Sequence, residues 1–208
     1  MKRLNQVVRN RRAAVLLFML MASCAAIPRL KVHYRLPSPS KRLEGMKIVL
    51  VVRDRRQVPV IFGKGARGEY ENFSGNISMN IVHHDGTGLE MGLYTPADML
   101  REALRRRLEN ENVTVMPASS RSGPRLEILL KRFVLDLVDR KWVATMAYDA
   151  RIVRAGRVAA TQSVEGQAER LKLLGRREAN IVVGEIFTDM VNRLDVSGLL
   201  RKAGSPQS

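Results

Sequence analysis

Cysteine is almost missing from this chain, since Cys24 is the only one among its 208 residues. A lone thiol cannot form a disulfide within the chain, so the fold must be held together by its apolar core. About 185 residues follow the N-terminal segment, which suits one domain, because domains usually have roughly 100 to 200 residues. The sequence therefore predicts a single domain without internal disulfide bonds.

Long apolar runs are missing as well. The N-terminal apolar stretch covers residues 13–27 and is ended by Pro28 and Arg29. It is shorter than the roughly 20 apolar residues that a helix needs to cross a bilayer, so a permanent transmembrane anchor is the weaker interpretation. The stretch follows a basic N-terminus and precedes the small residues Ala22 and Ser23, which is the pattern of a bacterial secretory signal peptide. The basic residues are Lys2, Arg3, Arg9, Arg11 and Arg12.

The residues around the cysteine carry a second signal. Met21-Ala22-Ser23-Cys24 resembles the lipobox of bacterial lipoproteins, in which the thiol is acylated and the signal is cut off just before the cysteine. Several acyl chains on one cysteine give durable anchoring where a single chain binds a membrane only marginally. We therefore predict a signal peptide over residues 1–23, cleavage between Ser23 and Cys24, and lipidation of Cys24. The alternative is an ordinary buried cysteine that happens to lie near a signal.

The residue after the cysteine bears on the membrane that receives the anchor. Ala25 stands there, and in enterobacteria-like sorting a residue other than Asp at this position usually directs a lipoprotein to the outer membrane. By this analogy we expect a lipid anchor in the outer membrane with the domain facing the periplasm. The periplasmic leaflet of the inner membrane is the weaker alternative.

The chain is strongly basic, with a net charge of +16. Removing the five basic residues of the signal leaves +11 on the mature chain. Such a charge favours anionic partners, namely phospholipid or lipopolysaccharide head groups or an acidic protein surface, and the secretion signal argues against nucleic acid. The alternative is that these charges only solvate the surface, because most of them alternate with apolar residues and do not cluster.

Composition divides the mature chain into three parts. Prolines, serines and basic residues dominate the segment up to Gly45 without a sustained apolar period, which predicts a lipidated N-terminus and flexible tether over residues 24–45. The patterned region predicts one domain over residues 46–200, and residues 201–208 are expected to form a disordered tail.

Hydrophobic periodicity predicts the elements of this domain. The strand at 47–53 is apolar almost throughout, which suits the interior of a sheet. Thr95 and Pro96 have the residue types of a helix N-cap and first turn, and the most regular helical apolar period covers residues 176–194. Further strands are expected at 76–83, 113–116, 126–133, 142–153 and 158–164.

The last three of these strands are separated by short turns, which predicts an antiparallel meander. The fold class expected is therefore α+β, with an antiparallel or mixed sheet of about four to five strands and two amphipathic helices packed on it. A partner-binding or membrane-lying role for the helix at 176–194 is the alternative to a core-facing one.

A glycine motif invites a nucleotide-binding interpretation. Residues 63–68 match the dinucleotide fingerprint G-x-G-x-x-G, but they begin well past the strand at 47–53, and residues 69–75 have no amphipathic helical period. The fingerprint needs a helix N-terminus to receive the pyrophosphate. A flexible loop is the favoured interpretation.

Residues with catalytic or metal-binding chemistry are few and scattered. His83 and His84 are adjacent, so a strand directs them to opposite faces, and an exposed loop edge with Asp85 is favoured over a metal site. The serines of residues 119–122 lack a G-x-S-x-G elbow, and Asp136 and Asp139 have the character of turn residues. We therefore predict no catalytic residues, no metal and no cofactor, and a protein that is not an enzyme.

The order of these features resembles a known family. The lipobox, the strand ending near residues 53–56, the glycine-containing loop, the helix that begins with Thr95-Pro96, the strand at 126–133 and the C-terminal helix containing Thr188-Asp189 resemble the YajG-type family of small bacterial lipoproteins. The resemblance covers most of residues 14–200. The segment from Arg53 to Thr95 departs from the family, because its glycine run at 63–75 looks expanded.

The chain is similar, more distantly, to the auxiliary lipoproteins of ABC-type and MCE-type lipid transport systems. Neither family has a strict catalytic signature. The resemblance implies a lipid-anchored, non-enzymatic binding or accessory component at the periplasmic face of the membrane, with an envelope protein as its partner. The alternative that it implies is an auxiliary lipoprotein that binds lipid or the transporter of such a system.

Overall fold

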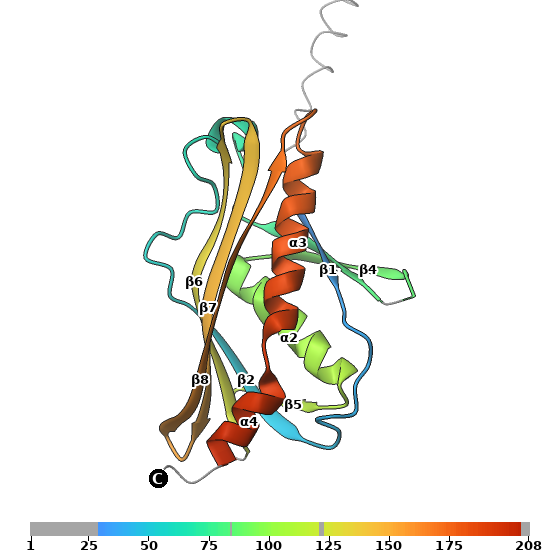
Figure 1. The fold of residues 1–208 in the computed structure, drawn as a ribbon, viewed down its shortest axis with the longest axis vertical. Coiled ribbons are helices and arrows are strands. Elements are labelled where there is room, and N and C mark those ends of the chain that lie inside the picture. The colour runs from blue at the N-terminus through green and yellow to red at the C-terminus, as the bar shows by residue number, and fades with distance from the viewer. Residues whose placement is uncertain (1–28, 84, 121–122, 205–208) are drawn as a thin grey trace, which may run out of the picture.

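The computed structural model describes residues 29–83, 85–120 and 123–204, and Figure 1 shows their arrangement. The predicted signal peptide, Ser23 and Cys24 lie outside the described residues. The elements, in chain order, are β1 (Leu30–Arg35), β2 (Lys47–Asp54), the 3-10 helix η1 (Arg67–Tyr70), β3 (Ile77–Val82), β4 (Gly88–Tyr94), α2 (Pro96–Asn110), β5 (Thr114–Met116), β6 (Arg125–Val138), β7 (Lys141–Arg154), β8 (Arg157–Leu171), α3 (Arg177–Arg193) and α4 (Val196–Gly204).

A five-stranded mixed sheet forms one layer, in the order β5-β2-β6-β7-β8. The strand β2 pairs in parallel with both β5 and β6, which confirms the interior position predicted for its apolar sequence. The strands β6, β7 and β8 form the predicted antiparallel meander. Their turns are short because the chain adopts positive φ angles at Asp139 and Arg140 and again at Ala155 and Gly156.

A second, three-stranded sheet has the order β1-β3-β4, with β1 parallel to β3 and β3 antiparallel to β4. The prediction of a flexible tether over residues 24–45 is therefore wrong for the part that forms β1. Leu30, Val32 and Tyr34 are fully buried, whereas the residues between them are exposed, which is the alternation of a strand with one face on the core.

The helices α2 and α3 lie on one face of the five-stranded sheet, and the three-stranded sheet lies beyond them (Figure 1). As predicted, Thr95 is the N-cap of α2, and its hydroxyl oxygen accepts a hydrogen bond of 3.2 Å from the Asp98 N–H. The helix α3 packs on β1, β7 and β8. The predicted disordered tail is wrong at its start, because α4 continues to Gly204.

Side chains fill the space between the five-stranded sheet and the helices. One continuous apolar cluster includes alternate residues of β6 and β7 and the buried stripes of α2 and α3. The fold is thus α+β, with mixed sheets of three and five strands and two helices packed against them. Among the helices of the described residues, none combines the length and the apolarity needed to span a bilayer.

Candidate functional site

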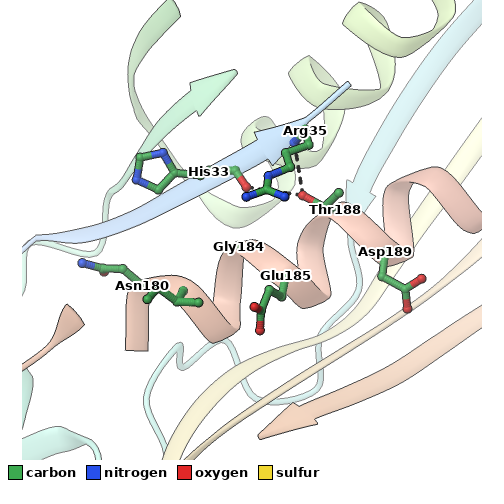
Figure 2. Close-up of a pocket in the computed structure, with 8 residues that line it drawn as sticks. His33, Arg35, Asn180, Gly184, Glu185, Thr188 and Asp189 are labelled. Carbon is green, nitrogen blue, oxygen red and sulfur yellow. Dashed lines mark hydrogen bonds between the residues drawn. The ribbon is translucent and has the colours of Figure 1, made fainter. Parts of the chain in front are cut away.

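The first candidate site is a groove of about 370 Å³ between β1 and α3 (Figure 2). The two elements run side by side in the same direction, because the Lys31 N–H donates to Asn180 Oδ1 at 2.9 Å near their starts. Towards their ends, Asn192 Nδ2 donates to the backbone oxygen of Arg35 at 3.0 Å. The groove therefore follows a seam between a strand edge and a helix.

A polar stripe on α3 builds this seam. Asn180, Gly184, Thr188 and Asn192 recur every four residues and so lie on one face of the helix. Thr188 Oγ1 accepts from the Arg35 N–H at 3.2 Å, as Figure 2 shows. These side chains take the place of a neighbouring strand at the edge of the sheet, which leaves the backbone of β1 paired on both sides.

Gly184 allows the two elements to approach closely. A Cβ at this position would lie 3.1 Å from the backbone oxygen of His33 and 3.3 Å from its nitrogen. This arrangement was not predicted from the sequence. The signal that could have revealed it is the four-residue spacing of Asn180, Gly184, Thr188 and Asn192 beside the apolar stripe of the helix.

Two tyrosine hydroxyls donate hydrogen bonds to the inner side of α3. The Tyr34 hydroxyl donates to Asn192 Oδ1 at 2.9 Å, and the Tyr148 hydroxyl donates to the backbone oxygen of Met190 at 2.8 Å. Burial raises the pKa of both phenols above the ordinary range, so they stay neutral. Their contacts are structural, since each hydroxyl is occupied by a group of α3.

The two carboxylates that line the groove form ion pairs with arginines outside it. Glu185 forms an ion pair with Arg170 at 2.6 Å, and Asp189 pairs with Arg193 one turn later. Both carboxylates point away from β1 in Figure 2. His33 lines the groove but is an exposed residue of β1. The groove thus has the exposed side chains of His33 and Arg35 on its β1 side and two ion-paired carboxylates on its α3 side.

The second candidate site is a more open groove of about 670 Å³ between the segment after β2 and the start of α2. Aromatic rings line it: Phe62 stacks on Tyr70 with ring centroids 4.2 Å apart, and Phe73 meets Phe62 edge to face at 4.8 Å. At its polar side, hydrogen bonds from Arg56 lower the pKa of Asp54 below its ordinary range. The groove offers apolar and aromatic surface with the Asp54–Arg56 pair and, further along, the charged residues Arg67 and Glu71.

The glycine motif lies next to this groove, and its predicted flexibility is wrong. Asp136 Oδ1 accepts hydrogen bonds from the Gly65 N–H at 2.9 Å and the Ala66 N–H at 3.2 Å. A Cβ on Gly63 would lie 2.1 Å from Asp136 Cγ. Gly63 and Gly65 are needed because the loop packs directly on β6. A carboxylate of the chain itself occupies the amides that a phosphate would use. The 3-10 helix η1 begins within the motif, at Arg67.

Asp136 is therefore not the turn residue that the sequence indicated, because it lies within β6 and anchors the loop. Asp139, in contrast, occupies the β6–β7 turn with a φ of 47°. His83 precedes the β3–β4 turn, in which Asp85 Oδ1 accepts from the Thr87 N–H at 2.9 Å. His84 and Ser122 lie outside the described residues, and the part of the chain that the structure covers has no cluster of three or more metal-ligating side chains.

Comparison with known proteins supplies likenesses of structure only. No protein-family model matches the chain, and no curated protein matches it. Its structure is similar to that of XCC0632 from Xanthomonas campestris, family DUF330, with a TM-score of 0.49, 17% identity, and coverage of 82% of this chain and 96% of that one. It is also similar to rare lipoprotein B from Shewanella oneidensis, with a TM-score of 0.39, 15% identity, and coverage of 71% and 89%. At these scores and identities, neither likeness assigns a function to this chain.

Proposed function

We propose that this protein is a lipoprotein of the bacterial envelope, anchored by Cys24 in the outer membrane, which acts as a non-enzymatic binding or accessory component at the periplasmic face. The lipobox motif supports the anchor. Two surface grooves, the larger of them lined by aromatic rings, support a binding role. The observation that carries the proposal is the free edge of the three-stranded sheet.

This edge is the strand β4, which pairs with β3 alone among the described strands. Five of its seven residues are exposed, and Leu89 and Leu93 are 49% and 54% exposed. An exposed edge with apolar side chains offers backbone donors and acceptors to an added strand. The other edge of the same sheet, β1, is already covered by the polar stripe of α3. We therefore place the docking site for an envelope protein at β4.

A photo-crosslinking residue at position 89 or 93, introduced in living cells, tests this site. The matched control is Val158, which is 50% exposed on the β7–β8 hairpin. We expect one discrete protein adduct from the two β4 positions and none from the control. Adducts of the same size from all three positions, or from none, would contradict docking at β4.

The anchor is tested separately by metabolic labelling with a clickable fatty acid, followed by fractionation of the membranes. We expect label on the wild-type chain in the outer-membrane fraction and no label on Cys24→Ala. Label on neither chain would show that Cys24 is an ordinary thiol. Label in the inner-membrane fraction would support the lipidation of Cys24 and contradict its anchoring in the outer membrane.

A second candidate is the auxiliary lipoprotein of an ABC-type or MCE-type lipid transport system. Side chains fill the space between the five-stranded sheet and the helices, so an acyl chain would have to bind elsewhere. The aromatic surface of the larger groove is the observation that favours this candidate. Native mass spectrometry of the protein released from membranes should then show a phospholipid adduct. The adduct should be lost on Phe73→Asp and kept on Leu93→Asp, and its survival in both would exclude this groove.

A further inference from the structure

The segment that joins β8 to α3 has two strongly exposed leucines. Leu173 and Leu174 are 69% and 86% exposed, the two highest values among the large apolar side chains. Leu171, which ends β8, and Val138, which ends β6, are 53% and 47% exposed. Such surface is costly in water and marks a contact site when it gathers in one place.

These residues gather at one end of the domain. The backbone N–H of Lys172 donates to the oxygen of Arg140 at 2.8 Å, so the β6–β7 turn lies against the segment. Lys172 also pairs with Glu69 of η1. Figure 1 shows the start of α3 at the same end of the molecule as the β6–β7 turn. We call the segment Leu171–Arg177, together with residues 138–140, the apolar end.

The N-terminal anchor leaves the domain at this same end. Because β1 and α3 run in the same direction and Lys31 bonds Asn180, the first residue of β1 lies beside the first turn of α3. Six residue steps separate Cys24 from Leu30, and six extended residues span at most about 22 Å. A lipid on Cys24 would therefore hold the apolar end close to the membrane surface.

The charges of this end suit an anionic surface. The apolar end has four basic residues, Lys172, Arg176, Arg177 and Arg140, and one acidic residue, Asp139. Of the four cations, Lys172 is already paired with Glu69. Arg176 and Arg177 stand at the start of α3, where the helix dipole disfavours cations, and Arg176 makes no side-chain capping bond. Arg176 does lie over the ring of Tyr70 at 5.3 Å. Helix stability does not explain two arginines here, whereas anionic head groups would.

We propose that the apolar end is a membrane-docking surface, in which Leu173 and Leu174 insert among phospholipid acyl chains and Arg176 and Arg177 contact anionic head groups. This inference rests on the proposed lipidation of Cys24, which orients this end towards the bilayer. Leucines that insert and cations that contact head groups are the two contributions that hold proteins at membrane interfaces. A lipid leaflet is favoured over a protein because the short anchor leaves this end facing the bilayer.

The chain itself offers a clean probe, because its only cysteine is the lipidated one. Leu174→Cys gives a single free thiol for a polarity-sensitive fluorophore. The control is Val158→Cys, which is 50% exposed and lies across the length of β7 from the apolar end. The lipidated protein is reconstituted in vesicles of phosphatidylcholine with phosphatidylglycerol that carry a quencher on the acyl chains. We expect quenching and a blue shift at position 174 and neither at position 158.

Neutralising the arginines tests the electrostatic part. In the labelled Leu174→Cys background, Arg176→Gln and Arg177→Gln should each reduce the ratio of docked to undocked protein about fivefold, since each cation near an anionic surface contributes on that order. Added salt should have the same effect. The matched control, Arg154→Gln with Arg157→Gln, changes two exposed arginines on the β7–β8 hairpin and should leave the ratio unchanged.

The outcomes separate this proposal from the anchor on which it rests. Protein that does not stay with the vesicles would show that Cys24 carries no lipid. Protein that stays with the vesicles but gives equal signals at positions 174 and 158 would overturn the docking surface and leave the anchor intact. Quenching that survives both arginine substitutions and high salt would overturn the role of the arginines. In cells, a protein adduct from a crosslinker at position 174 would show that this surface binds a protein partner, and would overturn docking to the membrane.

Discussion

The side chain of Asp136 shows how one residue can organise a loop that the sequence leaves open. Its carboxylate binds the amides of Gly65 and Ala66, and the loop approaches β6 so closely that side chains are excluded at two glycines. Nothing in the sequence pairs residue 136 with residues 63–66. The contact depends on strand placement, which becomes fixed only in the folded chain.

A Gly65→Ala substitution tests this close approach. The added Cβ would lie 1.9 Å from the backbone oxygen of Leu137, so the loop must move off β6. We expect a loss of about 1 to 3 kcal/mol in the free energy of unfolding, as overpacked sites show. Gly68→Ala is the control, because its Cβ would meet nothing within 4 Å, and it should stay within about 0.5 kcal/mol of the wild type. Equal effects in denaturant titrations would contradict the packing argument.

Asp195 provides a second prediction at this scale. Its Oδ1 accepts from the Gly198 N–H at 2.8 Å and from the Ser197 hydroxyl at 2.9 Å, which caps the first turn of α4. The Gly198 amide and the Ser197 hydroxyl lower the pKa of Asp195. Asp195→Ala should reduce stability by about 1 kcal/mol at neutral pH, and Asp195→Asn by much less, because Asn caps almost as well.

The pH dependence of this cap has a definite sign. Because the pKa of Asp195 is lower in the folded than in the unfolded chain, the charged cap contributes fully above the unfolded pKa and is lost as the pH falls through the folded one. The stability difference between wild type and Asp195→Ala should therefore shrink in acid. Hydrogen exchange of the α4 amides would measure it, and a difference that grows in acid would be inconsistent with the cap.

At the scale of elements, β1 was not predicted from its own residues, whereas most of the longer elements were. The elements β2, α2, α3 and the meander were predictable, because each has a sustained apolar period or a cap within its own residues. The alternation of β1 is only six residues long and lies among prolines and basic residues, so it resembled a tether. Its partner β3 begins at Ile77, far along the chain. The strand β4 was missed because it is glycine-containing and mostly exposed.

The site was less predictable than the fold. The residues that the sequence singled out, namely His83, the glycine motif and Asp136, have structural contacts in the folded chain. The two grooves are formed by segments distant in sequence, such as β1 with α3. The lipobox remains a sequence-based prediction, because Cys24 lies outside the described residues.

Replacing one residue on each face of β1 tests whether it is a strand or a tether. Leu30 is fully buried and its neighbour Lys31 is exposed. Leu30→Ala should lower the free energy of unfolding by about 2 to 5 kcal/mol, as expected for a buried leucine. Lys31→Ala should change it by no more than about 0.5 kcal/mol. A small effect of both, measured by chemical denaturation, would favour the tether.

At the scale of the whole molecule, Arg107 ties the helices α2 and α3 together. This residue of α2 is 9% exposed and reaches the far end of α3, where its guanidinium donates to the backbone oxygens of Val191 and Leu194. It also pairs with Glu111 at 3.3 Å. The cation satisfies carbonyls at a helix C-terminus, where the helix dipole favours positive charge.

Removing this connection should affect the global stability. Arg107→Ala leaves buried carbonyls and a carboxylate without their partner, so we expect a loss of about 3 to 5 kcal/mol. The control is Arg105→Ala on the same helix, whose ion pairs with Glu102 and Glu109 are partly exposed and should cost less than about 1 kcal/mol. An equal decrease of the thermal unfolding midpoint in both variants would contradict a larger stabilising contribution of Arg107.

The position of β1 also has a mechanical consequence. A pull on the N-terminus acts along the strand, and its six residues are paired with β3 on one side and held by the α3 stripe on the other. The load is then shared by all of these bonds in shear, so they must break together and cannot open one after another. A pulling force between the lipid anchor and the domain should therefore have to be high before β1 detaches, and β1 should then detach in a single step.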